Sequence, residues 1–420
     1  MKKIALVSIW LACTPLAQAE GFLPDAKAVE AAIDALPSVR TASVRVDSAA
    51  AQGRALDYGS HELNLGVVPT VRTVNNGATY SEWEVSLSRA IRLPEKARLD
   101  RNIGETGVNA AELGFADNRH MGARLFLQLW MSWLRAATTA DLALQQAGTL
   151  KEERRVITRR VVIGDAAKLD LDRADAALAQ ALVAVERADN DREQARIELS
   201  QQFPNIAPPT TVPKVPAPQS GHFDAEAAYR KIVEQNHEIE LANALARRED
   251  LSAKRANADR IPDPTVGLRW LNEVDGTENA VGVMLSIPFP NKGRSATAEA
   301  RMYDATAARV EAEGVALAVR TAARRLVEAF PARLRAWRAA NRALAANAES
   351  VQRIRRAWQL GETSYSEVLI ARRQYQDAAQ VEIGARLDAH EADLQIRIDS
   401  HELWVHHADD SLHAMHDTLP

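Results

Sequence analysis

Histidines and acids near the C-terminal end are the side chains most able to do chemistry. Imidazole nitrogens and carboxylates bind transition-metal ions, so this segment is a candidate metal-collecting tail. A solvated tail that holds no metal is the alternative. The candidate ligands are His401, His406 and His407, and His413, His416, Asp409 and Asp410 follow them.

No catalytic pattern accompanies these histidines. His401 and His406 are separated by about 140 degrees around a helix, whereas the two histidines of a metalloprotease helix share one face. Glycine-rich nucleotide-binding motifs are absent from the sequence. The only cysteine is Cys13, and Trp10 occupies the position where a lipoprotein signal needs leucine. The sequence predicts no enzyme, no cofactor and no lipid anchor.

Residues 1–19 have the pattern of a secretory signal peptide. Lys2 and Lys3 precede an apolar run, and Ala17-Gln18-Ala19 is a small-x-small cleavage pattern. Cleavage after Ala19 removes two lysines and no acid, so the formal charge changes from −4 to −6. That charge argues against a nucleic-acid partner. No later stretch is apolar enough for a membrane-spanning helix, and a secreted chain without one can still enter a membrane through β-strands.

Two long stretches, residues 104–203 and 291–407, have helix-forming compositions. Both are rich in Ala, Arg, Leu, Glu and Gln, and Pro331 is the one proline within them. Their length is typical of coiled coils. In the second stretch an apolar residue recurs every seven positions, which predicts a left-handed supercoil. The repeating residues are Phe330, Trp337, Leu344, Val351 and Trp358.

Each long stretch is interrupted once, at Gly164 and at Gly361, which are 197 positions apart. The glycines supply the turn conformation, and the acids that follow, Asp165 and Glu362, favour the start of a new helix. Each stretch is therefore predicted to form a helical hairpin with its tip at the glycine.

Strand patterns repeat at nearly the same offset. Apolar residues alternate with polar or small ones, which predicts strands with one lipid-facing and one water-facing side. The apolar positions are Trp83, Val85, Leu87 and Ile91 in the first half, and Val281, Val283, Leu285 and Ile287 in the second. Leu63, Leu65 and Val67, and Val266, Leu268 and Trp270, form the preceding strands, and Asn-Gly and Asp-Gly turn signals follow them.

The domain order follows from this repeat. After the signal peptide, the first repeat covers 20–203, with a strand pair at about 61–93 and a helical hairpin at about 95–203. A linker at 204–221 follows, with six prolines in residues 204–218. The second repeat covers 222–407, with strands at about 264–289 and a hairpin at about 291–407, and a histidine-containing tail occupies 408–420.

This doubled order resembles the TolC family of outer-membrane efflux proteins. The tip pattern G-[DE]-x-x-x-x-[DE] occurs twice, as Gly164-Asp165…Asp170 and as Gly361-Glu362…Glu367. The resemblance implies a mainly α protein with membrane β-strands, in which long coiled-coil hairpins extend into the periplasm. Four strands are too few to close a barrel, so the chain must pool its strands with copies of itself. The family implies a homotrimer with a 12-stranded barrel in the outer membrane of a Gram-negative bacterium.

Within the family, length and the segment Ser286–Arg294 look most like the CzcC and CusC branch, which exports heavy-metal cations with a periplasmic adaptor and an inner-membrane RND pump. By this resemblance the tips form the periplasmic entrance and the adaptor contact, and Glu367 is either a lumen acid or only a helix-start acid. Ile370 stands where the branch has a further acid. Trp358 fits the coiled-coil core better than a gate.

Other functions remain open at this point. A drug-efflux or type I secretion channel would share the same architecture. A periplasmic adaptor should have one hairpin rather than two, and a structural coiled coil should lack the alternating strands.

Overall fold

The computed structural model describes residues 21–75, 77–219 and 223–405. The predicted signal peptide and the tail at 408–420, with His406 and His407, lie outside these residues. In chain order the elements are α1 (Ala26–Asp34), α2 (Pro37–Tyr58), β1 (Leu63–Thr73), β2 (Thr79–Ala90), α3 (Pro94–Val162), α4 (Lys168–Gln202), α5 (Ala225–Glu234), α6 (His237–Ala258), β3 (Thr265–Glu273), the 3₁₀ turn η1 (Val274–Gly276), β4 (Glu278–Ser286), α7 (Lys292–Gln359) and α8 (Tyr365–Asp399). Within the described residues, none of the helices has the length and apolar character needed to cross a membrane.

The chain divides into two compact units. Among the described residues, the first contains 21–32, 129–219 and 336–389, and the second contains 33–75, 77–128, 223–335 and 390–405. Helices α3, α7 and α8 each contribute residues to both units. The mostly helical architecture, with two long hairpins and four strands, confirms the predicted fold class.

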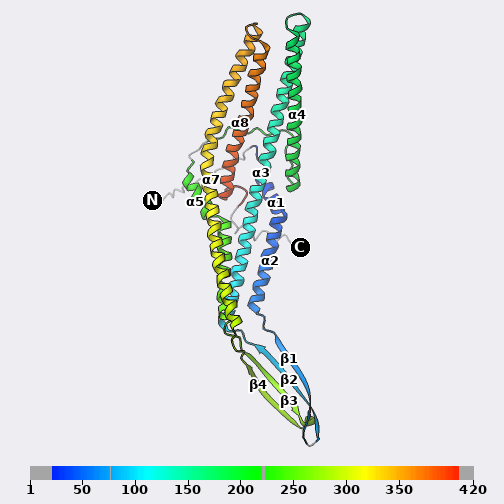
Figure 1. The fold of residues 1–420 in the computed structure, drawn as a ribbon, viewed down its shortest axis with the longest axis vertical. Coiled ribbons are helices and arrows are strands. Elements are labelled where there is room, and N and C mark those ends of the chain that lie inside the picture. The colour runs from blue at the N-terminus through cyan, green and yellow to red at the C-terminus, as the bar shows by residue number, and fades with distance from the viewer. Residues whose placement is uncertain (1–20, 76, 220–222, 406–420) are drawn as a thin grey trace, which may run out of the picture. The chain divides into compact units, whose positions relative to one another are not determined.

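The strands of the second unit form one antiparallel sheet in the order β1-β2-β3-β4, drawn side by side in Figure 1. Its register puts Leu65, Leu87, Leu268 and Val283 in one row across all four strands, so that these apolar side chains share a face. The neighbouring row, Gly66, Ser86, Arg269 and Gly282, belongs to the opposite face. Trp83 and Trp270 add an edge-to-face pair to the apolar side, with ring centroids 4.8 Å apart.

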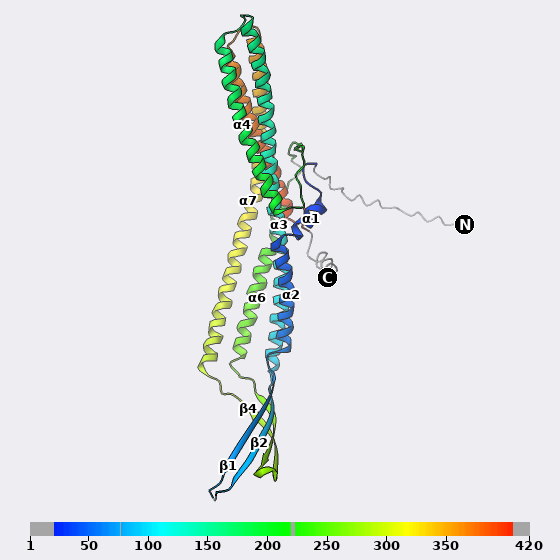
Figure 2. The same ribbon diagram turned by 90° about the vertical axis from the view of Figure 1, so that its right-hand side faces the viewer.

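Helices α2, α3, α6 and α7 of this unit continue from the strands as a layer, with α6 between α2 and α7 (Figure 2). Gly53 of α2 and Gly104 of α3 meet closely, since a Cβ on Gly104 would lie 2.9 Å from the Gly53 Cα atom. Arg255 of α6 binds Asp100 of α3 at 2.6 Å. Along the chain, α2 precedes the edge strand β1, and α7 follows the edge strand β4.

A buried charge network fixes the junction where strands give way to helices. The Lys96 side chain is 1% exposed, and its Nζ atom lies 3.1 Å from Asp259 Oδ1 and 2.9 Å from Asp263 Oδ1. Asp263 also accepts from the backbone N–H of Leu93 and lies 2.8 Å from His61 Nε2. Because Lys96 follows β2 and Asp263 precedes β3, the network joins the two repeats.

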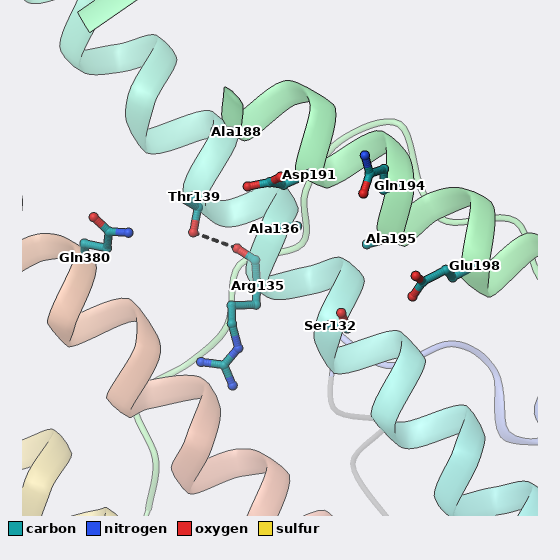
Figure 3. Close-up of a pocket in the computed structure, with 10 residues that line it drawn as sticks. All are labelled: Ser132, Arg135, Ala136, Thr139, Ala188, Asp191, Gln194, Ala195, Glu198 and Gln380. Atoms are coloured by element: carbon teal, nitrogen blue, oxygen red, sulfur yellow. Dashed lines mark hydrogen bonds between the residues drawn. The ribbon is translucent and has the colours of Figure 1, made fainter. Parts of the chain in front are cut away.

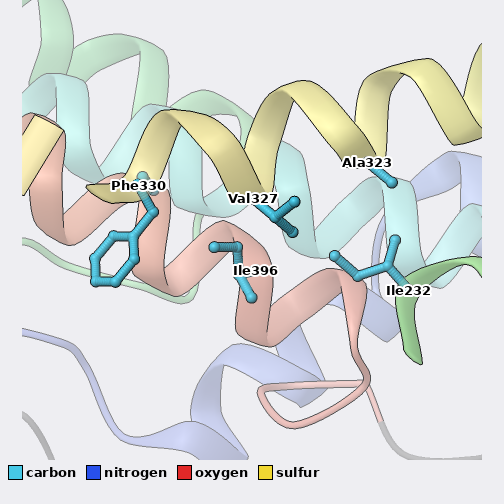
Figure 4. Close-up of a cluster of buried hydrophobic side chains, with 6 residues drawn as sticks. Ile232, Ala323, Val327, Phe330 and Ile396 are labelled. Atoms are coloured by element: carbon cyan, nitrogen blue, oxygen red, sulfur yellow. The ribbon is translucent and has the colours of Figure 1, made fainter. Parts of the chain in front are cut away.

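Apolar packing holds the short helix α5 against the long ones. Asp224 caps α5 by accepting from two backbone N–H groups, and Ile232 then points into a cluster of buried side chains (Figure 4). The cluster consists of Ile232, Ala323, Val327, Phe330, Ala392 and Ile396. In the first unit, the heptad residues from Trp337 to Trp358 are partly buried along α7.

Candidate functional site at the helical turns

Two tight turns close the helical hairpins of the first unit. Gly164 lies between α3 and α4 with φ +78°, and Gly361 lies between α7 and α8 with φ +80°. No atom comes within 4 Å of the position that a Cβ would take at either glycine. The need for glycine is therefore a matter of backbone conformation rather than of space.

The acids at the first turn are neutralised by neighbouring arginines. Asp165 accepts from Arg160 Nε at 2.7 Å, and Asp170 pairs with Arg173 at 3.5 Å. Arg160 also places its guanidinium 4.9 Å from the centre of the Trp358 ring, on the other hairpin. The first turn thus contributes little unbalanced negative charge.

The second turn differs. Glu362 and Glu367 are exposed, and within the described part of the chain neither forms an ion pair. Glu367 lies in the first turn of α8, where the helix dipole favours a carboxylate. Two unneutralised carboxylates per chain can attract cations from solution. Both predicted acids, Glu362 and Glu367, are therefore accessible to solvent in this chain, whether they face the inside or the outside of an assembly.

A buried cluster brings the two hairpins together close to their turns. Ile157 and Ala174 come from the first hairpin, and Tyr365 and Val368 from the second, each at most 1% exposed. Trp358 packs beside this cluster, with its ring centroid 5.5 Å from that of Tyr365. Trp358 is thus packed between helices, as a coiled-coil residue would be.

An ion pair that the sequence did not suggest crosses the same contact. Glu153 of α3 binds Arg372 of α8, and the two side chains are 8% and 14% exposed. Burial and the nearby Glu153 carboxylate raise the pKa of the Tyr365 hydroxyl beside them. The sequence does contain a sign that Glu153 is buried. On α3, Glu153 lies three residues after Leu150 and four before Ile157, which is the spacing of a buried apolar stripe.

A groove of about 420 Å³ lies between α3, α4 and α8 in the same unit (Figure 3). Small side chains such as Ala136, Ala188 and Ala195 line it. Arg135 crosses to α8, donating to the Gly384 carbonyl at 3.3 Å and to Asp388 at 2.7 Å. The small residues leave room between the helices, and the arginine holds the hairpins together there.

Of the candidate metal ligands His401, His406 and His407, only His401 lies within the described residues. His401 follows α8, and its ring stacks on that of His237 with centroids 4.6 Å apart. Among residues 21–75, 77–219 and 223–405, no group of three or more His, Cys, Asp or Glu side chains is placed to hold a metal ion.

Comparison with known proteins finds similarity in structure but not in sequence. No protein-family model and no curated protein sequence matches the chain. The CmeC outer-membrane channel of Campylobacter jejuni superposes with a TM-score of 0.74 at 14% identity, covering 94% of this chain and 89% of CmeC.

Two further solved structures show the same likeness. CusC, described for its transmembrane channel formation, gives a TM-score of 0.70 at 16% identity, over 92% of this chain and 95% of CusC. The open MtrE outer-membrane channel of Neisseria gonorrhoeae gives 0.69 at 17% identity, over 90% and 89%. The chain therefore has the fold of the bacterial outer-membrane channels.

Proposed function

We propose that the chain is one subunit of a homotrimeric outer-membrane channel in a tripartite efflux system. The observation that carries the proposal is the sheet. One face of the sheet carries a row of exposed apolar side chains. Within the described residues, each of the edge strands β1 and β4 pairs with only one neighbouring strand. Unpaired backbone groups cannot face lipid, so a membrane-embedded sheet of this kind needs strands from further copies.

The edge helices support the same assembly. On α2 an exposed stripe repeats with alternating spacings of four and three, and it consists of Val44, Ser48, Ala51, Ala55 and Tyr58. The corresponding stripe on α7 is Tyr303, Ala307, Val310, Gly314 and Leu317. This spacing is that of a coiled-coil seam, and both stripes face away from their own chain's helices. Since α2 and α7 flank the layer, the α7 seam of one copy can pack on the α2 seam of the next.

In this assembly the helical turns form the periplasmic entrance and meet a periplasmic adaptor that links the channel to an inner-membrane RND pump. Exposed apolar residues beside the turns support a protein contact there, namely Val162 and Ile163 at the first turn and Leu360 at the second. The unneutralised Glu362 and Glu367 favour cationic cargo. Heavy-metal cations are the proposed substrates, and drug export or type I secretion is the alternative.

The test combines assembly with transport. The channel should fractionate with the outer membrane and migrate as a trimer in mild detergent, and a soluble periplasmic monomer would contradict the proposal. A strain that lacks the gene should then be exposed to metal salts and, in parallel, to drugs. Sensitivity to metals alone supports metal export, whereas sensitivity to drugs alone supports the alternative cargo.

A further inference from the structure

A charged side chain, that of Arg89, lies on the apolar face of the sheet. The register pairs Arg89 of β2 with Leu63 of β1 on one side and with Val266 of β3 on the other, so the three residues share a face. All three side chains are exposed. An arginine that is flanked by apolar side chains on a lipid-facing surface needs a polar partner at the edge of the membrane.

Arg89 lies at the end of this face that is nearest the helices. It is one residue before the end of β2, and α3 begins five residues after it. Its Nε atom donates to the backbone carbonyl of His61 at 3.0 Å, and His61 precedes β1. The guanidinium is therefore directed toward the strand–helix junction. Beside β4, in contrast, exposed apolar side chains continue past Leu285 to Ile287 and Phe289.

The next basic side chains along the chain are neutralised within it. Arg92 lies 3.0 Å from a carboxylate oxygen of α3, and Lys96 lies against the two aspartates of the junction network. Among the described residues no carboxylate forms an ion pair with Arg89, and this includes Glu62 and Glu95, which are exposed near the junction. Within that part of the chain, the positive charge of Arg89 is therefore available to a group outside the chain.

A phosphate is the group that fits an arginine in this position. The planar guanidinium can donate two N–H groups to two phosphate oxygens, and the hydrogen bond from Nε to His61 leaves the N–H groups of both Nη atoms for that purpose. The apolar stem of Arg89 can remain beside Leu63 and Val266 while its charged end reaches the level of the lipid headgroups. Phospholipids present phosphate groups at that level.

We propose that Arg89 binds the phosphate group of a phospholipid in the periplasmic leaflet of the outer membrane. The inference rests on the proposed function, which places the sheet in that membrane and the helices in the periplasm. The bound phosphate holds the helix-side edge of the sheet at the membrane surface. In a homotrimer the site occurs once in each copy, on the lipid-facing side.

Native mass spectrometry of the full-length channel in mild detergent, titrated with dioleoylphosphatidylglycerol, tests the site. Arg89→Gln should retain this lipid with roughly tenfold lower affinity than wild type, because it loses a hydrogen-bonded charge that faces the phosphate. Arg89→Lys should lose less affinity than Arg89→Gln, since an ammonium group still attracts phosphate. Dioleoylglycerol, which has the same acyl chains and no phosphate, should bind equally to wild type and Arg89→Gln.

Arg269→Gln is the matched control. Arg269 is an exposed arginine of the same sheet, it pairs with Ser86 on the opposite face, and among the described residues it forms no ion pair with a carboxylate. Arg269→Gln should therefore retain the phospholipid as wild type does. A second measurement needs no variant: phosphatidylglycerol with a photoreactive group beside its phosphate should label wild-type peptides that contain Leu63 or Ile91, which lie on either side of the proposed site.

Equal retention of phosphatidylglycerol by wild type and Arg89→Gln would overturn the proposal, and a less stable Arg89→Gln trimer with equal retention would indicate that Arg89 pairs with another copy of the chain instead. An equal loss in Arg269→Gln, or an equal loss of dioleoylglycerol, would also overturn it, as would labelling that misses both peptides. A trimer in the outer membrane without Arg89-dependent lipid binding would refute this inference alone. A soluble monomer would refute the proposed function as well.

Discussion

At the residue scale, Gly164 and Gly361 determine the backbone conformation of the two turns that close the helical hairpins. Gly361→Val forces a β-branched residue to adopt φ +80°, which costs on the order of 1–3 kcal/mol and should reshape the turn. We expect the variant to assemble as a trimer but to lose export, because the turn no longer fits its partner. Gly148→Val is the control, since Gly148 is an exposed helical glycine with open space around it and no positive φ. Equal loss of export in both variants would rule out a role for the turn conformation.

The Glu153–Arg372 pair gives the second prediction at this scale. Arg372→Met leaves Glu153 buried and uncompensated, and breaking such a pair typically costs about 3–5 kcal/mol. The helical circular-dichroism signal should therefore be lost at a lower temperature in Arg372→Met. Glu153→Gln/Arg372→Met, which buries no charge, should recover most of the loss. If the double variant is as unstable as the single one, the two side chains do not act as a pair.

The sequence predicted the turn glycines and missed this pair for a physical reason. A glycine that interrupts a helical pattern is a local signal, because the conformation it permits depends on its own backbone. The partner of Glu153 is 219 positions away, and nothing in the periodicity of either helix selects Arg372 over its neighbours.

At the element scale, the strand alternation was enough to predict the four strands and which of their residues share a face, because side-chain direction has a period of two. The structure places Leu285 with Val266 and Ser286 with Thr265, on opposite faces. Leu285→Arg should block membrane assembly, since an arginine facing the bilayer centre costs about 2–4 kcal/mol. Ser286→Arg should assemble and change single-channel conductance. Equal tolerance of the two arginines in heat-modifiability gels would show that the faces are assigned incorrectly.

The strand–helix junction should make stability depend on pH. Burial opposes ionisation of Asp263, but hydrogen bonds from Lys96 and His61 lower its pKa below the ordinary value of 3.8. A depressed folded-state pKa adds stability that is complete above the unfolded value and is lost as pH falls through the folded value. The wild-type advantage over Asp263→Asn should therefore be constant from about pH 7 to pH 5 and shrink below about pH 4. We expect it to be about 3 kcal/mol at neutral pH, because Asp259 still faces the buried Lys96.

Thermal unfolding of both proteins across this range measures the difference. Asp304→Asn provides the control, since among the described residues Asp304 forms an ion pair only with the exposed Arg301, at 3.6 Å, and the change should alter stability by less than about 0.5 kcal/mol. An advantage of wild type over Asp263→Asn that grows below pH 4 would contradict a depressed pKa at Asp263.

At the scale of the whole molecule, assembly depends on whether the α2 and α7 seams meet between copies. The two helices flank a layer in which α3 and α6 lie between them, so the seams cannot meet within one chain. Chain direction sets them antiparallel, because α2 runs toward the sheet and α7 runs away from it. Val44 lies 14 positions from the sheet-side end of α2, at Tyr58, and Ala307 lies 15 positions from the start of α7, at Lys292. At a rise of 1.5 Å per residue these positions are at nearly equal depth.

Val44→Cys/Ala307→Cys should therefore form disulfides between copies, visible as dimer and trimer bands on non-reducing gels. No native cysteine should contribute to these disulfides, because Cys13 is the only cysteine in the sequence and lies in the predicted signal peptide. Val44→Cys/Ala318→Cys is the control, since Ala318 is also exposed on α7 but lies about one-quarter turn from the Leu317 position of the seam and well beyond the depth of Val44. Bands that are equally strong in both pairs would reflect random collision. If Val44→Cys/Ala307→Cys gives no such bands but the protein still migrates as a trimer, the copies meet through other helices. The assignment of the α2 and α7 seams would then be wrong, whereas the argument for self-assembly from the unpaired edge strands would still hold.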